Sequence, residues 1–207
     1  MSKLKEPHNK FEFLEELRSI AQLGLNYTKD PFDKARFQRL LELTSIKYSE
    51  LSNTPVDRII ERFQKELGHV TPKVGVDAAI FNNEGKILLT KRTDDNLWCL
   101  PCGWTELNES LQESLKRELL EEVNLHSEVK SIIEIFTRLP GTYGQPHTSY
   151  HILYYCIALD NNLKTSEEVS EYGYFNHTQN IMWHKDHEIR AKLAYEYWTN
   201  TINNKTF

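Results

Sequence analysis

The hydrophobic pattern of the chain changes its period at Thr71-Pro72, and this change does most to limit the folds open to it. Before that point, apolar residues recur every three or four positions, which is the spacing of amphipathic helices. After it they form short apolar runs separated by turn residues, which is typical of strands. The 207 residues therefore divide into a small all-α part at 1–70 and an α/β part at 71–207.

Three helices are expected in the first part. Their apolar sets span residues 11–25, 37–46 and 56–67. Thr54-Pro55 is a favourable start for the third helix, and Gly68 is a favourable end. Three helices of this size bury little apolar surface by themselves. We therefore expect them to pack on the rest of the chain or on a second copy of it.

The second part combines strands with two helices. Strands are expected at 74–81, 86–91, 129–136 and 150–159, and helices at 111–123 and 186–202. The first two strands are joined by the turn sequence Asn-Asn-Glu-Gly at 82–85, which predicts a hairpin with a four-residue loop.

Composition excludes several classes of protein. Hydrophobic residues make up 39% and charged residues 27% of the chain, as in soluble folded proteins. The net charge of −5 argues against a protein that wraps duplex nucleic acid. No apolar run approaches the roughly 18 residues of a membrane span, and the start lacks a secretory pattern. With three cysteines and no disulfide framework, a cytoplasmic location is expected.

An acidic helix at 111–123 carries the strongest chemical signal. Ser110 and Glu113 form the sequence signature of a capping box, so a helix begins there. Glu118, Glu121 and Glu122 fall within an arc of about 100° on this helix. Carboxylates crowded in this way repel each other unless a cation lies between them, and oxygen ligands suit Mg²⁺ or Mn²⁺. The alternative is a solvated acidic face, which is the usual role of such runs.

The full pattern around this helix resembles the Nudix box, Gly-x5-Glu-x7-Arg-Glu-U-x-Glu-Glu-x-Gly-U, where U is a bulky aliphatic residue. The matching residues are Gly103, Glu109, Arg117, Glu118, Leu119, Glu121, Glu122 and Leu125. A chance match in a chain of this length is on the order of one in 10⁵. Two residues depart from the family pattern: Asn124 replaces the second glycine of the box, and Cys102 replaces a glycine just before it.

The resemblance implies a Nudix α/β/α sandwich with a mixed sheet and a role for each matching residue. Glu118 and Glu122 would be the main metal ligands, together with the backbone carbonyl of Cys102. Glu121 would be a further ligand or an outer group. Arg117 and Glu109 would form an ion pair that orients the helix. The asparagine at 124 should still tolerate the left-handed conformation that the family glycine adopts at the end of the helix.

The general base stays open between a glutamate of the box and one from a later loop. Glu168 and Glu171 lie where such a loop belongs, although each alone could be an ordinary exposed acid. Arg92, Trp104 and Arg138 are the candidate substrate-binding residues. For the two arginines an exposed or structural role is the preferred interpretation, and for Trp104 core packing is the alternative to stacking on a base or sugar.

Two further patterns bear on the function. Cys99-Leu-Pro-Cys102 is formally a Cys-x-x-Cys motif, but the chain has no second pair, so zinc or redox use is disfavoured. Residues 17–27, 36–40 and 71–74 resemble a bacterial Nudix subfamily with a helical N-terminal domain, whose members are dimeric. This resemblance implies a homodimer that uses residues 1–70.

Together these features predict Mg²⁺-dependent hydrolysis of a nucleoside diphosphate linked to another group, with a nucleoside monophosphate and X-phosphate as products. ADP-ribose and CDP-choline are the leading substrates by resemblance. One alternative is a non-hydrolytic Nudix domain that senses a nucleotide, which the intact set of acids disfavours. Another is a 3′ exonuclease that uses the same metal site on short RNA.

Overall fold

The computed structural model of the protein describes residues 9–66, 69–176 and 179–203. The chain forms two compact units. The helical unit comprises Met1–Lys73 together with the excursion Arg138–Ser149, and the α/β unit comprises Val74–Thr137 and Tyr150–Phe207. No helix in the described part of the chain is both long enough and apolar enough to cross a bilayer.

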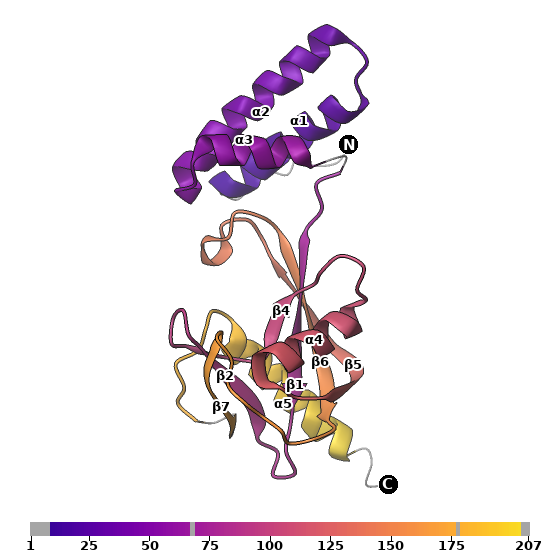
Figure 1. The fold of residues 1–207 in the computed structure, drawn as a ribbon, viewed down its shortest axis with the longest axis vertical. Coiled ribbons are helices and arrows are strands. Elements are labelled where there is room, and N and C mark those ends of the chain that lie inside the picture. The colour runs from indigo at the N-terminus through magenta and orange to yellow at the C-terminus, as the bar shows by residue number, and fades with distance from the viewer. Residues whose placement is uncertain (1–8, 67–68, 177–178, 204–207) are drawn as a thin grey trace. The chain divides into compact units, whose positions relative to one another are not determined.

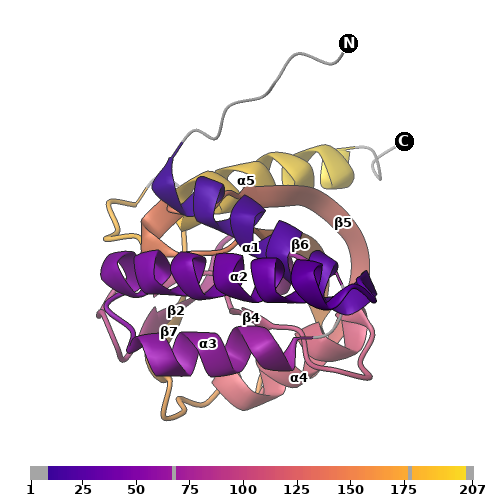
Figure 2. The ribbon, with the colours of Figure 1, turned by 90° about the horizontal axis from the view of Figure 1, so that it is seen from above.

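The helical unit contains the three helices that the sequence predicts. They are α1 (Lys10–Tyr27), α2 (Pro31–Ser52) and α3 (Val56–Lys65). The side chain of Asn9 caps α1, and that of Asp30 accepts a hydrogen bond from the Asp33 N–H at the start of α2. Figure 2 shows the three helices of this unit lying side by side. Gly68, the expected end of the third helix, lies outside the described residues.

Each of the three helices contributes to one small core. Its buried members are Leu14, Ala21, Leu41, Tyr48, Ile59 and Phe63. Other apolar side chains of the same helices face outward, and Phe13, Ile20, Leu43 and Ile46 are each more than two-fifths exposed. The core is therefore thin, and α1 and α2 also present apolar surface to their surroundings.

The α/β unit holds two sheets (Figure 1). The first has four strands in the order β4-β1-β6-β5, and the second has three in the order β3-β2-β7. The strands are β1 (Lys73–Ile80), β2 (Ile87–Arg92), β3 (Trp98–Cys99), β4 (Cys102–Trp104), β5 (Ser127–Arg138), β6 (Ser149–Ala158) and β7 (Val169–Phe175). The short helix η1 (Thr142–Gly144) belongs to the excursion of the helical unit.

The predicted hairpin between the first two strands is only partly correct. The turn at 82–85 is present, because the Asn82 N–H donates to the Lys86 carbonyl and Phe81 bridges Ile87. Beyond that bridge the two strands enter different sheets. β1 pairs with β4 in the register Asp77↔Cys102, whereas β2 pairs with β3 and β7. Pairing with residues distant in the sequence therefore outweighs the local hairpin.

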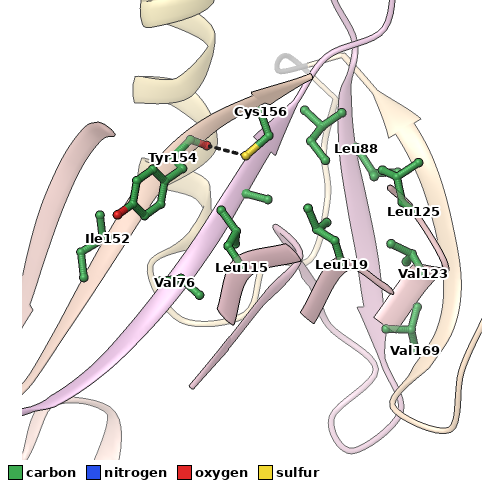
Figure 3. Close-up of a cluster of buried hydrophobic side chains, with 12 residues drawn as sticks. Val76, Leu88, Leu115, Leu119, Val123, Leu125, Ile152, Tyr154, Cys156 and Val169 are labelled. Atoms are coloured by element: carbon green, nitrogen blue, oxygen red, sulfur yellow. Dashed lines mark hydrogen bonds between the residues drawn. The ribbon is translucent and has the colours of Figure 1, made fainter. Parts of the chain in front are cut away.

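Alternate residues of the central strands face two different helices. Val76, Ala78 and Ile80 pack with Leu115 and Leu119 of α4 (Leu111–Val123). Figure 3 shows these α4 leucines close to Val76 and to residues of β6. The residue between them in the strand, Ala79, belongs instead to the cluster that includes Ala191 and Ala194 of α5 (His187–Asn203). The two helices thus cover opposite faces of the strands (Figures 1 and 2).

Candidate active site on helix α4

The start of α4 is fixed by a complete capping box. The Glu113 N–H donates to Ser110 Oγ (3.3 Å), and the Ser110 N–H donates to the Glu113 carboxylate (2.8 Å). The helix ends at Asn124, whose φ of 55° and ψ of 39° are left-handed. The N–H groups of Asn124 and Leu125 donate to the carbonyls of Leu120 and Leu119. The left-handed helix end predicted for Asn124 is therefore present.

Arg117 connects most of the acids around this helix. Its Nε donates to Glu109 Oε1 (2.9 Å), which is the predicted ion pair. Its Nη1 lies 2.9 Å from Glu118 Oε1 and 2.8 Å from Glu121 Oε2. Its Nη2 donates to the Trp104 carbonyl (3.1 Å), which ties α4 to β4. One guanidinium thus holds three carboxylates and a strand in place.

Glu118 and Glu122 are the most enclosed acids of α4. The Glu118 side chain is 13% exposed, and Glu122 as a residue is 6% exposed, whereas the Glu121 side chain is 60% exposed. The Cys102 N–H donates to Glu122 Oε2 (3.1 Å), so this carboxylate reaches the first residue of β4. The structure therefore brings Glu118, Glu122 and the backbone of Cys102 together and leaves Glu121 at the rim.

Gly103 of β4 makes room for this arrangement. A Cβ atom at this position would overlap the carboxylate of Glu118. No side chain can therefore stand at 103 without displacing that acid from the strand. The glycine at the start of the box pattern thus has a steric reason in this chain.

The pKa values of Glu118 and Glu122 are both raised. Burial raises the pKa of Glu118, and Glu121 and Glu168 raise it further, although hydrogen bonding to Arg117 opposes the shift. Burial raises the pKa of Glu122 well above its ordinary range, with contributions from Cys99, Glu118 and Glu168. Glu168 therefore lies within electrostatic range of both acids, although it comes from the segment before β7.

The two later glutamates are in different surroundings. The Glu168 carbonyl accepts a hydrogen bond from the Thr93 N–H (3.0 Å), which anchors its backbone near the end of β2. Glu171 is a residue of β7 and not of a loop, and its carboxylate lies 2.7 Å from Lys91 Nζ. Glu168 thus lies within electrostatic range of the α4 acids, whereas Glu171 pairs with a lysine of the neighbouring strand.

The predicted substrate-binding residues are also separated. Arg92 is held by Asp94 through two hydrogen bonds of 2.9 and 2.6 Å. Trp104 is 41% exposed, and its ring lies against that of His151 at 5.2 Å. Arg138 is buried in the helical unit, with its guanidinium over the ring of Tyr143. Of the three, Trp104 is the one placed beside the α4 acids, because its backbone carbonyl accepts a hydrogen bond from Arg117.

The Cys-x-x-Cys motif lies beside a buried polar network that the sequence analysis missed. Cys99 and Cys102 are free thiols, and Cys99 Sγ lies 3.4 Å from Thr90 Oγ1. Asp77, Cys102 and His187 each bring one donor atom within 4.8 Å of the others, as a metal site would require. However, Arg190 already pairs with Asp77 at 2.6 Å, and both side chains are fully buried.

His187 argues against an ion at that position. Its Nδ1 accepts a hydrogen bond from the Leu100 N–H (3.2 Å), so in the neutral ring the proton is on Nε2. Neither nitrogen then offers a spare lone pair for a metal. The network is better explained as a structural support beneath β4. One signal of it was present in the sequence, since Asp77 is the single charged residue in an otherwise apolar strand core.

The α4 acids fit a divalent cation better than the Asp77 group does. Glu118 and Glu122 offer oxygen donors, which are the ligands that Mg²⁺ prefers. Burial and, to a lesser extent, neighbouring acids raise the pKa of both carboxyls, and a bound cation would offset both effects. The absence of a side chain at Gly103 is what lets the Glu118 carboxylate lie against β4.

Comparisons with known proteins agree with these features. The NUDIX domain family matches residues 71–197, and the family described as UDP-X-like, N-terminal oligomerisation domain matches residues 10–63. The chain is 30% identical over 165 residues to "Putative ADP-ribose pyrophosphatase YjhB" of Bacillus subtilis (strain 168), covering 79% of each protein. It is 29% identical to an ADP-ribose pyrophosphatase of Methanocaldococcus jannaschii, over 64% of this chain and 78% of that protein.

Solved structures share the fold. A UDP-X diphosphatase crystal structure matches with a TM-score of 0.58 over 92% of this chain and 94% of the other, at 23% identity. The NUDIX domain of Shewanella oneidensis NrtR, solved with ADP ribose, matches with a TM-score of 0.52 over 62% of this chain and 90% of its own, at 20% identity. From the family matches over both units, the chain belongs to the Nudix hydrolase family and has a UDP-X-like N-terminal oligomerisation domain before its NUDIX domain.

Proposed function

We propose that this Nudix hydrolase cleaves the diphosphate bond of a nucleoside diphosphate linked to a second group, in a Mg²⁺-dependent reaction. The observation that carries the proposal is the placement of two enclosed acids of α4 against β4: Glu118 lies against Gly103 and pairs with Arg117, and Glu122 accepts a hydrogen bond from the Cys102 N–H. The name of one relative, ADP-ribose pyrophosphatase, supports ADP-ribose as a substrate. ADP-ribose and CDP-choline remain our leading candidates, and the UDP-X diphosphatase of similar fold adds UDP linked to another group.

Glu118 and Glu122, with the carbonyl of Cys102, would hold the metal, and Glu121 would contribute from the rim. A Mg²⁺ or Mn²⁺ ion held there would supply charge neutralisation for the phosphate oxygens and a lowered pKa for a nearby water molecule. Arg117 keeps the ligands in position, because it contacts Glu118, Glu121 and the Trp104 carbonyl at the same time.

The remaining steps are the attack of water, the removal of its proton and the binding of the base or sugar. The oxygen of a water molecule attacks one phosphorus while the bond from that phosphorus to the bridging oxygen breaks. The products are a nucleoside monophosphate and X-phosphate. Glu168 would accept the proton of the attacking water, because it is the later glutamate within electrostatic range of Glu118 and Glu122. Trp104, half-exposed at the end of β4, offers a flat surface for a base or sugar.

A substrate panel tests this proposal. ADP-ribose, CDP-choline, UDP-glucose, a dinucleoside polyphosphate and a short RNA are each incubated with the full-length protein, with Mg²⁺ or with EDTA, and the products are separated by chromatography. We expect one of the nucleoside diphosphate derivatives to yield a nucleoside monophosphate only when Mg²⁺ is present. Cleavage of RNA alone would point to the exonuclease reading. Tight binding of a nucleotide without turnover would point to a sensor.

A further inference from the structure

The helical unit encloses a second candidate site, which is separate from the α4 acids. It is a cavity of about 510 Å³ lined by residues of α1, α2, α3, the segment between α3 and β1, the first residue of β1 and the excursion around Pro146. All of its lining residues belong to the helical unit. Its volume is within the range of roughly 300 to 1,000 Å³ that is usual for small-molecule pockets.

Positive charge dominates the lining. The cations are Arg18, Arg58, Arg62 and Lys73, and the carboxylates are those of Glu15 and Glu66. The cavity therefore has two more permanent positive than negative charges. A walled space with such an excess concentrates anions, because its field is less screened than at an open surface.

The two carboxylates are already engaged. Arg18 lies 3.0 Å from Glu15 and also pairs with Glu66. Arg62 reaches Glu66 only at 3.7 Å. In the part of the chain that the structure describes, the side chains of Arg58 and Lys73 have neither a hydrogen bond nor an ion pair. The unbalanced charge is therefore contributed mainly by these two residues.

Burial and the positive charges around the cavity lower the pKa values of Lys73 and His147. Burial lowers the pKa of Lys73, and Arg62 and Arg18 lower it further. The pKa of His147 is lowered to about 4, mainly by burial and to a lesser extent by the positive charges of Lys73, Arg62 and Arg18. His147 is therefore neutral at pH 7 and adds no charge to the cavity. Arg62 and Arg18 therefore lower both pKa values in addition to burial, as nearby positive charges do.

An uncharged donor lies in the same wall. The Oγ atom of Ser52, at the end of α2, is buried and has no hydrogen-bond partner among the described residues. A buried hydroxyl is rarely left unsatisfied, so a ligand oxygen or a water molecule is the expected partner.

We propose that this cavity binds a small phosphate-bearing anion. A doubly charged phosphate monoester matches the excess of two positive charges, and arginine side chains suit the geometry of phosphate oxygens. A carboxylate would leave one positive charge uncompensated. The site is independent of the proposed hydrolysis, because none of its lining residues belongs to α4 or β4.

Calorimetric titration of the full-length protein tests the proposal. The probes are inorganic phosphate, pyrophosphate and AMP, added separately in EDTA at low salt, so that no divalent ion supports binding at the α4 acids. We expect at least one probe to bind with a Kd below about 1 mM. Binding of AMP alone would identify an organic phosphate as the ligand, and binding of phosphate or pyrophosphate a free inorganic ion.

The variants Arg58→Met and Lys73→Met remove the two unpaired cations from exposed positions, so the fold should persist. Each should weaken binding by about tenfold or more. The matched control is Arg36→Met, since Arg36 is exposed on the same unit, pairs with Asp33 and does not line the cavity. Absence of binding by all three probes would overturn the proposal, and so would equal binding by the wild type and both cavity variants. Because no hydrolysis is measured, this result does not depend on the proposed reaction.

Discussion

At the residue scale, two requirements on the Glu122 carboxylate oppose each other. Glu122 must be buried to reach the backbone of Cys102, yet burial raises the pKa of its carboxyl and disfavours the charged form. Gly103 allows Glu118 to approach the strand by having no side chain. Burial and neighbouring groups therefore both disfavour the charged form of Glu122.

The raised pKa of Glu122 predicts that Glu122→Gln stabilises the metal-free protein, whereas in Mg²⁺ the same substitution should remove a stabilising ligand. The folded pKa of Glu122 is raised, so its contribution to stability is present at low pH and is lost as pH rises above the ordinary carboxyl range. In EDTA, we expect the variant to melt higher than the wild type at pH 8, and the difference to shrink toward pH 4. With Mg²⁺ the wild type should gain in Tm and the variant should gain little.

Differential scanning calorimetry at several pH values checks both effects. Glu196→Gln is the control, because it removes an exposed acid of α5. If Mg²⁺ raised the Tm of Glu122→Gln as much as that of the wild type, Glu122 would not be a metal ligand.

The two later glutamates allow a matched comparison of catalytic roles. Glu168→Gln should lower kcat by about 10² to 10⁴-fold with little change in KM, because it removes the proposed general base. Glu171→Gln should have little effect, since it breaks an exposed pair with Lys91 that contributes at most about 1 kcal/mol. Steady-state kinetics on both variants decides the assignment. A larger loss in Glu171→Gln than in Glu168→Gln would reverse it.

At the scale of elements, α4 was the most predictable part of the chain. Its capping box, its length and its left-handed end all follow from local sequence, and the structure has each of them. The strand pairing was less predictable, because β1 pairs with β4 and β2 pairs with β7, and in both pairs the partner residues lie far apart in the sequence. The buried pair of Asp77 and Arg190 could not be foreseen either, since 113 positions separate its members.

The end of α4 provides a stability test. Asn124 is left-handed, which favours glycine, but its Nδ2 also donates to the Asn162 carbonyl (2.8 Å). These effects oppose each other, so Asn124→Gly should change the free energy of unfolding by less than about 1 kcal/mol. Asn124→Val should destabilise by about 1 to 2 kcal/mol, because a β-branched residue resists positive φ.

Chemical denaturation of both Asn124 variants gives these values. Activity should persist in Asn124→Gly, because the ligands lie on earlier turns of the helix. A sharp loss of turnover without a loss of stability would instead give Asn124 a role in substrate binding.

At the scale of the whole molecule, the assembly of the chain follows from its apolar surface. Phe13 and Ile20 are seven residues apart on α1, so they share one face of the helix, and both are about half exposed. The match to an oligomerisation domain over residues 10–63 includes this face. We therefore predict a homodimer that buries it.

Light scattering after size exclusion tests the assembly. Ile20→Arg should convert a dimer to a monomer at micromolar concentration, because it places a charge in the predicted interface. Ile189→Arg is the control, since Ile189 is a comparably exposed residue of α5 in the other unit. A wild-type protein that is already monomeric would refute the prediction.

The most direct test of the central claim is the turnover of Glu118→Gln and Glu122→Gln on the best substrate of the panel, followed by ³¹P NMR with Mg²⁺ present. Our account predicts a fall in kcat of at least about 100-fold in each variant, because each substitution removes a carboxylate that would hold the charge-stabilising metal. Circular dichroism should show an unchanged fold, since glutamine and glutamate have similar helix propensities. Near-normal Mg²⁺-dependent turnover in both variants would contradict the assignment of the active site to α4.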